Sequence, residues 1–295
     1  MLTLRQLTTH LTADLAALYP APEADALAGQ LLEHLLHLTP LQRRMQATDV
    51  VPEATLAELE PLRTRLLRHE PLQYVLGTAH FAGLELEVTP ATLIPRPETE
   101  ELVALIAAEQ RGRTGLRVLD VGTGSGCIPL ALAQVLPEAH LTALDVSGAA
   151  LAVAERNAAK YHVPLHLQQV DILAEVPQLP APLDVLVSNP PYVLENERPQ
   201  MRPNVLDYEP ATALFVPNHD PLLFYRRIAG LGRELLAPGG ALYFEINEQF
   251  AAETVALLQA LGYAAAAAHP DLFGKLRMVR ATWPESGAGT GITQG

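Results

Sequence analysis

Residues 117–128 read Arg-Val-Leu-Asp-Val-Gly-Thr-Gly-Ser-Gly-Cys-Ile. This order is typical of a buried strand that runs through a Gly-rich turn into a helix, because glycine lets the backbone approach a ligand where a Cβ would collide. Around this segment, strand-like apolar runs alternate with helical stretches. Strands are expected at 116–121, 140–146, 165–170, 183–188, 240–246, 263–268 and 276–281, and helices at 128–136, 149–160, 221–236 and 248–261. Such alternation predicts an α/β fold with a mostly parallel sheet and helices on both faces.

The N-terminal part has a different pattern. Between Leu4 and Leu67, apolar residues recur at helical spacing and glycine is scarce, which predicts a small helical bundle. Its helices, four or five in number, are expected to be separated by Pro20, Pro22, Pro40, Pro52 and Pro61. Alternation around Gly83 then predicts a short β-hairpin. We therefore expect a helical domain at 1–73, a hairpin linker at 74–95, a catalytic domain at 96–283 and a disordered tail at 284–295.

The composition narrows the possible functions. Lys and Arg number 20 against 33 Asp and Glu, which gives a formal net charge of -13. Because nucleic-acid binding by counterion release needs the opposite sign, stable binding to nucleic acid is not expected. Cys127 is the single cysteine and the histidines show no metal-ligand spacing, so we expect neither a disulfide nor a metal site. The sequence shows no export signal and no membrane-spanning run, and we expect a cytoplasmic monomer.

The Gly-rich turn predicts a nucleotide-like cofactor. Asp145 ends the next expected strand, 19 residues beyond Gly126, where a carboxylate can accept hydrogen bonds from both hydroxyls of a ribose. Both a dinucleotide and S-adenosylmethionine contain such a ribose. The alternate glycines 122, 124 and 126, with Asp120 before them, favour S-adenosylmethionine, because a carboxylate repels a pyrophosphate and attracts an ammonium or sulfonium group. For the glycines alone, an ordinary strand-to-helix connection is the alternative.

Further positions belong to the predicted cofactor site. The turn between Gly122 and Gly126 includes Thr123, Gly124 and Ser125, which are expected to lie along the cofactor with the glycines. Asp171 follows the third expected strand and could accept a hydrogen bond from an adenine amino group. An Asp in that position is also typical of a turn or a helix cap.

The sequence Asn189-Pro190-Pro191-Tyr192 follows the fourth expected strand. The carboxyl ends of parallel strands form the ligand-binding edge of such a sheet, so this tetrapeptide is expected beside the cofactor. The two prolines fix the backbone so that the Asn189 side-chain oxygen and the Pro190 carbonyl can both accept hydrogen bonds from one NH2 group. Tyr192 would pack flat on a planar substrate. An amide or aromatic amine is a poor nucleophile because its lone pair is delocalised, and these two acceptors should help it lose planarity. A rigid turn after a strand is the alternative interpretation.

Together, these motifs resemble the class I methyltransferases that act on exocyclic or amide nitrogens. Three more segments are similar to the peptide chain release factor N5-glutamine methyltransferases: Leu93-Ile-Pro-Arg-Pro-Glu-Thr-Glu, Glu209-Pro-Ala-Thr-Ala-Leu and Asp271-Leu-Phe-Gly-Lys-Leu-Arg. With the helical domain in front, the resemblance extends to about Arg280. It implies a class I methyltransferase fold, which is Rossmann-like with a mostly parallel seven-stranded sheet, joined to the helical bundle by the hairpin.

The resemblance also implies an activity and a site. The implied reaction transfers a methyl group from S-adenosylmethionine to the side-chain amide nitrogen (N5) of the glutamine in the Gly-Gly-Gln motif of release factors. Asn189 to Tyr192 would hold that glutamine, and Asn189 would also lie beside the cofactor. Gly122 to Gly126, Asp145 and Ile172 would lie along the cofactor, with Ile172 in place of a larger aromatic residue. Glu245-Ile-Asn departs from the more usual Glu-Ile-Gly.

Some features admit other interpretations. Arg96, Glu98 and Glu100 are expected to have a structural role at the domain junction, because Thr99 and the acids suit the first turn of a helix.

A nucleic-acid N-methyltransferase would share the Asn-Pro-Pro-Tyr chemistry but should carry a basic face or a target-recognition domain. A nucleotide-binding module without methyl transfer would bind NAD instead of S-adenosylmethionine. We expect the helical domain to dock the release factor.

Overall fold

The computed structural model describes residues 2–285 and divides the chain into two compact units. One unit contains the chain up to Thr78 together with Met201–Tyr208, and the other contains Ala79–Gln200 together with the chain from Glu209 onward. Of the tail expected at 284–295, the part from residue 286 lies outside the described residues. Within the described chain, no helix has both the length and the apolar character needed to span a bilayer.

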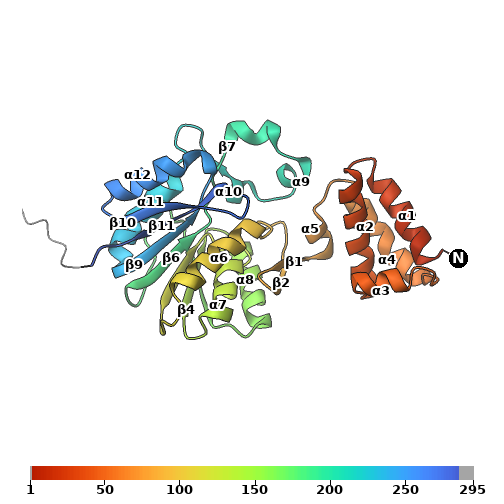
Figure 1. Cartoon of the computed structure of the whole chain (residues 1–295), viewed down its shortest axis with the longest axis horizontal. Coiled ribbons are helices and arrows are strands. Elements are labelled where there is room, and N and C mark those ends of the chain that lie inside the picture. The colour runs from red at the N-terminus through yellow and green to blue at the C-terminus, as the bar shows by residue number, and fades with distance from the viewer. Residues whose placement is uncertain (1, 286–295) are drawn as a thin grey trace, which may run out of the picture. The chain divides into compact units, whose positions relative to one another are not determined.

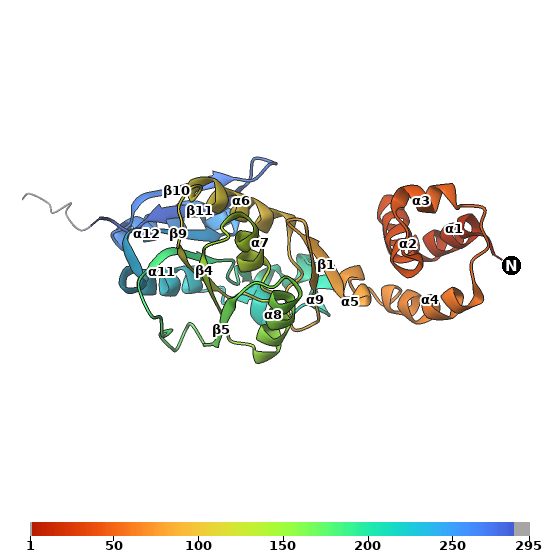
Figure 2. The same ribbon diagram turned by 90° about the horizontal axis from the view of Figure 1, so that it is seen from below.

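The first unit is a helical bundle, as the sequence predicts. Its helices are α1 (Leu4–Leu15), α2 (Ala21–Leu36), α3 (Pro40–Met45), α4 (Glu53–Leu66) and α5 (Leu72–Leu76), and α9 (Pro203–Leu206) belongs to its second segment. Leucines at helical spacing, among them Leu7, Leu11, Leu31 and Leu66, form its core, and Figure 2 shows α1 to α4 gathered together. The second segment is held by Arg202, which pairs with Glu23 at 3.1 Å. From the sequence, residues 201–208 were expected within the catalytic domain at 96–283. No local pattern around Arg202 indicates that it pairs with Glu23.

Prolines mark most of the helix boundaries in this unit. Pro20 and Pro52 cap α2 and α4, and Pro40 is the first residue of α3. The prediction that Pro61 separates two helices is wrong, because Pro61 lies inside α4. A proline there removes one backbone hydrogen bond, and burial of leucines on both sides of it in the bundle core opposes that loss.

A two-stranded sheet follows the bundle. It consists of β1 (Thr78–Phe81) and β2 (Leu84–Glu87). Ala82 and Gly83, which connect them, have φ of 47° and 80°. Positive φ at both central positions is the signature of a tight type I′ hairpin turn, and this is the predicted hairpin.

The second unit contains a seven-stranded sheet. Its strands are β3 (Arg117–Val121), β4 (His140–Asp145), β5 (Leu165–Gln169), β6 (Leu183–Ser188), β9 (Leu236–Glu245), β10 (Ala264–Pro270) and β11 (Leu276–Thr282). They lie in the order β10-β11-β9-β6-β3-β4-β5. The pairs from β9 to β5 are parallel, and β11 is antiparallel to both of its neighbours. The predicted mostly parallel seven-stranded sheet is confirmed.

Helices cover both faces of this sheet (Figure 1). One face carries α6 (Pro97–Glu109), α7 (Cys127–Val135) and α8 (Gly148–Lys160), and the other carries α11 (Leu223–Leu235) and α12 (Ala251–Ala260). Alternate strand residues feed the two cores, since Val118 and Val185 pack on the first side and Leu119 and Leu186 on the second. The short elements are β7 (Val193–Leu194), η1 (Glu195–Gln200), α10 (Ala211–Leu214), β8 (Phe215–Val216) and η2 (Glu248–Phe250).

The strand order fixes where a ligand can bind. From β3 the chain moves outward to β4 and β5, and then returns to place β6 on the other side of β3. The direction of winding therefore reverses between β3 and β6, and the carboxyl ends of these strands diverge into a crevice. The Gly-rich turn leaves β3 and the Asn-Pro-Pro-Tyr segment leaves β6, so the fold brings both motifs to this crevice.

Candidate active site

A cavity of about 410 Å³ lies at the carboxyl ends of β3, β4 and β6. A volume in this range suits a small-molecule ligand. Its walls include Gly122 and Gly124, Asp145, Asp171 and Ile172, and the segment Asn189–Pro191. Most of the residues predicted from sequence therefore meet in one place.

The Gly-rich turn opens two of its glycines to this cavity. Gly122 and Gly124 have φ of 79° and 55°, and a Cβ built on either would meet no atom within 4 Å. The open space on that side is the cavity itself. Gly126 differs, because its Cβ would lie 3.3 Å from the Cβ of Ala154 on α8. Gly126 therefore permits close helix packing, while Gly122 and Gly124 form a surface that a ligand can approach.

Thr123 and Ser125 lie between these glycines and do not line the cavity. Both are buried, and neither side-chain hydroxyl has a hydrogen-bond partner within the described structure. Cys127, directly after Gly126, is partly buried against the core, and burial raises the pKa of its thiol to about 12. A thiol that stays protonated is a poor nucleophile, which agrees with its interpretation as a small core residue.

Asp145 connects β4 to the Gly-rich turn. One carboxylate oxygen accepts a hydrogen bond from the backbone N–H of Gly124 at 2.9 Å, and the other accepts one from Ser147 N–H at 2.9 Å. Burial raises the pKa of Asp145, and these backbone donors oppose the rise. Each carboxylate oxygen keeps a lone pair for a further donor, so Asp145 can shape the turn and bind a ligand at once.

Asp120 directly precedes Val121 and Gly122, which line the cavity. It is 0% exposed, and neither carboxyl oxygen has a hydrogen-bond partner among the described residues. Burial, together with the nearby Asp145 carboxylate, raises the pKa of Asp120 to about 7. An unpaired buried carboxyl is costly. A cationic group in the cavity would favour its ionised form, so this pair of orphaned oxygens fits a ligand with an ammonium or sulfonium group.

Asp171 and Ile172 form another wall. The Asp171 carboxylate accepts a hydrogen bond from Leu173 N–H at 3.0 Å, and its carbonyl accepts one from Glu175 N–H at 2.8 Å. The residue thus starts a turn, which was the alternative interpretation, and it also lines the cavity. Ile172 is 9% exposed and adds an apolar surface to the same wall.

The Asn-Pro-Pro-Tyr segment continues from β6. Ser188, the last residue of that strand, donates its hydroxyl to the carbonyl of Val121 at 2.6 Å and so ties the two strand ends together. Asn189, Pro190 and Pro191 line the cavity. The Asn189 side-chain Nδ2 donates to the hydroxyl of Thr99 at 3.2 Å. The NH2 end of the amide is therefore turned toward Thr99, and the amide oxygen is left to accept.

Tyr192 faces away from these neighbours. Its hydroxyl donates to Glu245 Oε1 at 3.0 Å, its ring packs against the core beneath α11 and α12, and it is not part of the cavity wall. Burial, followed by the Glu245 carboxylate, raises the pKa of the phenol well above its usual value. The structure thus brings Asn189 to Pro191 together with the Gly-rich turn but not Tyr192, whose contact with substrate stays a prediction.

Two protein-family models match this chain. Residues 99–206 match the family model described as methyltransferase small domain, and residues 6–77 match the PrmC N-terminal domain. A release factor glutamine methyltransferase from Bacteroides thetaiotaomicron is 41% identical over 278 residues, covering 94% of this chain and 99% of that protein. The chain belongs to the release factor glutamine methyltransferase family.

Other relatives agree with this family assignment. A release factor glutamine methyltransferase from Flavobacterium psychrophilum is 38% identical and covers 92% of this chain and 96% of that protein. A crystal structure described as a methyltransferase from Pyrococcus furiosus is 20% identical, covers 68% of this chain and 90% of that chain, and has a TM-score of 0.50. At that identity, the likeness concerns the fold alone.

Within this family member, the structure explains two of the resembling segments by joining them. Glu209, which begins one segment, is almost fully buried and accepts a hydrogen bond from Ile94 N–H at 3.1 Å. Its other oxygen binds Arg96 Nη2 at 2.5 Å. The residues that follow Glu209 and those that precede Ile94 both line the cavity. Arg96 thus joins two segments whose neighbouring residues line the cavity, which is a structural role.

Two residues of the site were not predicted from the sequence. Thr99 and Glu245 are 2% and 1% exposed, and the Thr99 hydroxyl donates to Glu245 Oε2 at 2.6 Å. From the sequence, Thr99 was expected only in the first turn of a helix. Glu245 was noted only as part of the tripeptide Glu245-Ile-Asn, and neither was expected to contact Asn189. The one available signal was a glutamate at the end of an otherwise apolar strand, since an acid in that setting needs a buried partner.

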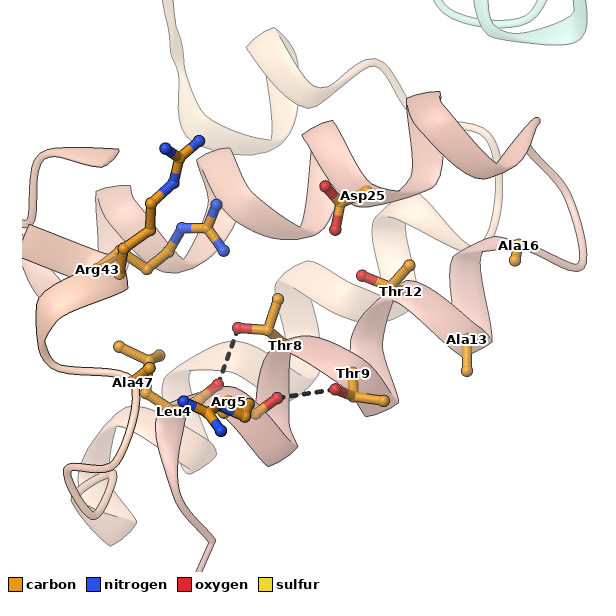
Figure 3. A pocket seen from close by; sticks show the side chains of 11 residues that line it. Leu4, Arg5, Thr8, Thr9, Thr12, Ala13, Ala16, Asp25, Arg43 and Ala47 are labelled. Atoms are coloured by element: carbon orange, nitrogen blue, oxygen red, sulfur yellow. Dashed lines mark hydrogen bonds between the residues drawn. The ribbon is translucent and has the colours of Figure 1, made fainter. Parts of the chain in front are cut away.

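A separate cavity of about 470 Å³ lies in the helical unit, between α1, α2 and α3 (Figure 3). Thr8 and Thr9 in its wall donate to the carbonyls of Leu4 and Arg5 one turn earlier. Arg43 pairs with Glu33 at 2.8 Å. Thr8, Thr9 and Arg43 therefore use their polar groups within the bundle, while the Thr12 hydroxyl in the same wall is buried without a hydrogen-bond partner among the described residues.

Proposed function

We propose that this chain transfers a methyl group from S-adenosylmethionine to the side-chain amide nitrogen (N5) of the glutamine in the Gly-Gly-Gln motif of peptide chain release factors. The observation that carries the proposal is that a cofactor-type turn at Gly122 and Gly124 and an amide-binding pair at Asn189 and Pro190 open into one cavity. Membership of the release factor glutamine methyltransferase family selects this substrate among amide and amine acceptors.

The residues of the turn would hold S-adenosylmethionine. Gly122 and Gly124 let it approach the backbone, and Asp145 accepts from its ribose. Asp120, behind the turn, balances its positive charge, and Thr123, Ser125 and Gly126 keep the turn in shape. Asp171, Ile172 and Asn189 complete the surroundings of the adenine and of the reacting end. When bound, the cofactor supplies a methyl group made electrophilic by its sulfonium.

The Asn-Pro-Pro-Tyr segment would prepare the acceptor. A primary amide has two N–H groups, and the Asn189 oxygen and the Pro190 carbonyl can accept one each. Both acceptors hold the nitrogen in a fixed place, which converts an intermolecular reaction into an oriented one. They also stabilise the positive charge that grows on nitrogen as the new bond forms, so no strong base is required before attack. Pro191 and Tyr192 complete the acceptor site in this proposal.

The helical domain at 1–73 would dock the release factor, the hairpin at 74–95 would link it, and 96–283 would carry out the transfer. Support comes from the match of residues 6–77 to the PrmC N-terminal domain. The net charge of -13 suits a protein partner better than a polyanionic one. A release factor substrate also implies a cytoplasmic protein, and we propose that it acts as a monomer without stable nucleic-acid binding.

Mass spectrometry of a purified release factor after incubation with the protein and S-adenosylmethionine tests this function. The expected product carries one added methyl group, located by fragmentation on the glutamine of Gly-Gly-Gln. A matched incubation with DNA or ribosomal RNA is expected to give no methylated base. Methylation of nucleic acid instead of the release factor would overturn the substrate, and NAD binding without S-adenosylmethionine binding would overturn the chemistry.

A further inference from the structure

We propose that Thr99 and Glu245 are positioning residues that fix the orientation of the Asn189 side-chain amide, so that its oxygen and not its NH2 group faces the acceptor nitrogen. This inference rests on the proposed function, because that function assigns the Asn189 oxygen to the substrate amide. It adds two residues that do not line the cavity themselves.

The sheet register brings the relevant residues together. β6 and β9 are parallel neighbours in which Ser188 pairs with Phe244. Asn189 directly follows β6 and Glu245 is the last residue of β9, so they lie side by side at the carboxyl edge. Thr99 enters from the first turn of α6 and contacts both, at 3.2 Å to Asn189 Nδ2 and 2.6 Å to Glu245 Oε2.

The direction of each hydrogen bond follows from chemistry. An ionised carboxylate can only accept, so the Thr99 hydroxyl must donate its single hydrogen to Glu245. The same hydroxyl can then only accept from its other neighbour. Asn189 must therefore present its NH2 group to Thr99, which turns the amide oxygen the other way. The oxygen and the NH2 group of an amide have nearly the same shape. Without these hydrogen bonds, either of them could face the cavity.

The second oxygen of Glu245 also acts as an acceptor, which favours the same direction of the hydrogen bonds. It accepts from the Tyr192 hydroxyl at 3.0 Å, so both carboxylate oxygens receive a proton donor. Burial, together with the Glu98 charge, raises the pKa of Glu245, while the hydrogen bonds from Thr99 and Tyr192 and the Arg277 charge oppose that rise. The ionised form is the one that satisfies Thr99 and Tyr192 together. A neutral amide at position 245 could satisfy only one of them as an acceptor.

The test uses steady-state methylation of a release factor by the full chain. Thr99→Val keeps the shape of the side chain and removes the hydroxyl. We expect its kcat to fall roughly tenfold or more, while KM for the release factor and calorimetric affinity for S-adenosylmethionine change by less than about threefold. Thr99→Ser restores the hydroxyl and should restore most of kcat. Glu245→Gln should lower kcat at least as much as Thr99→Val. With an amide at position 245, the hydrogen bonds between residues 245, Thr99 and Asn189 can all run in the opposite direction, so the Asn189 amide can turn its NH2 group to the acceptor.

Two matched variants control for general damage to the fold. Thr254 is also fully buried and donates to the carbonyl of Phe250, the N-cap residue of its helix α12, so Thr254→Val removes a comparable hydroxyl away from the site. Glu109 accepts from the Tyr243 hydroxyl at 2.7 Å and from Arg280 Nε at 3.0 Å, so Glu109→Gln removes a carboxylate that holds a tyrosine hydroxyl away from the site. Both variants should keep kcat close to that of the wild type.

A double-mutant cycle separates positioning from a purely structural role. If Thr99 acts through Asn189, then Thr99→Val should cost no further rate in a chain that already carries Asn189→Ala. Additive losses in kcat would overturn the inference, as would a wild-type kcat for Thr99→Val. Failure of the wild-type protein to methylate a release factor would instead overturn the proposed function, so the two failures are distinguishable.

Discussion

The carboxylate of Asp145 accepts a hydrogen bond from the backbone N–H of Gly124 at 2.9 Å. The last residue of β4 therefore holds the turn that leaves β3, and the cavity lies against both. Because one side chain supports the turn and is also the expected ribose partner, loss of Asp145 should affect cofactor binding in two ways.

Replacing Asp145 by Ala should weaken S-adenosylmethionine binding by roughly 1.5 to 3 kcal/mol, the range for loss of a hydrogen bond to a charged group. Isothermal titration calorimetry measures this difference. Asp184→Ala is a suitable control. Asp184 accepts a hydrogen bond from Arg117 N–H at 2.9 Å at the start of β3, which is the end of the strand opposite to the cavity. Equal affinities of Asp145→Ala and the wild type would remove Asp145 from the site.

Replacing Asn189 by Ala should leave cofactor affinity nearly intact and lower kcat by roughly 100-fold or more, because an oriented acceptor at the reacting atom is lost. Single-turnover methylation of a release factor gives the rate, and calorimetry gives the affinity. Asn218→Ala, at an exposed position whose side chain binds Asn196 N–H, is the control. A folded Asn189→Ala protein with a near-normal rate would contradict the assignment.

Stability should fall as pH rises, because of Asp120. Its pKa is raised from 3.8 in the unfolded reference to about 7, so the folded protein binds the proton more tightly between these values. The free energy of unfolding should therefore decrease from about pH 4 to about pH 7, by on the order of 4 kcal/mol, and level off above that range. Urea unfolding of the wild type and of Asp120→Asn across this range measures the effect. The variant should show a flatter profile, and parallel profiles would contradict the shift.

The ion pair between Arg96 and Glu209 should behave asymmetrically. Arg96→Met leaves the buried Glu209 carboxylate without its charged partner and should lower the free energy of unfolding by about 2 kcal/mol or more. Glu209→Gln should cost less, and the double variant should be more stable than Arg96→Met alone. Arg226→Met removes an exposed pair with Asp220 and should change stability little. A double variant no more stable than Arg96→Met would contradict this account.

Removal of the helical domain should separate docking from chemistry. A chain that begins near Leu76 should still bind S-adenosylmethionine but should methylate intact release factor poorly, because remote contacts supply the energy that positions the amide. A short Gly-Gly-Gln peptide should be methylated at a similar rate by both chains. Full activity of the shortened chain on intact release factor would overturn the docking role alone.

Local sequence patterns determined most of the architecture. Apolar runs of period two and helical repeats encode which backbone forms at each position and which face is buried. The strands, the helices on both faces and the hairpin around Gly83 follow from these patterns. The Gly-rich turn and the Asn-Pro-Pro-Tyr segment could be placed at the same edge because carboxyl ends of parallel strands always share it.

Only the tertiary structure decided which buried polar groups pair. Thr99 lies 146 residues from Glu245 and 90 residues from Asn189, and Arg96 lies 113 residues from Glu209. Such pairs depend on strand register and on the path of loops, which no local period encodes. The same reason explains why residues 201–208 joined the helical unit and why Tyr192 faces Glu245. Periodicity specifies the faces of helices and strands, whereas the partner of each buried hydrogen-bonding group is set by the packed fold.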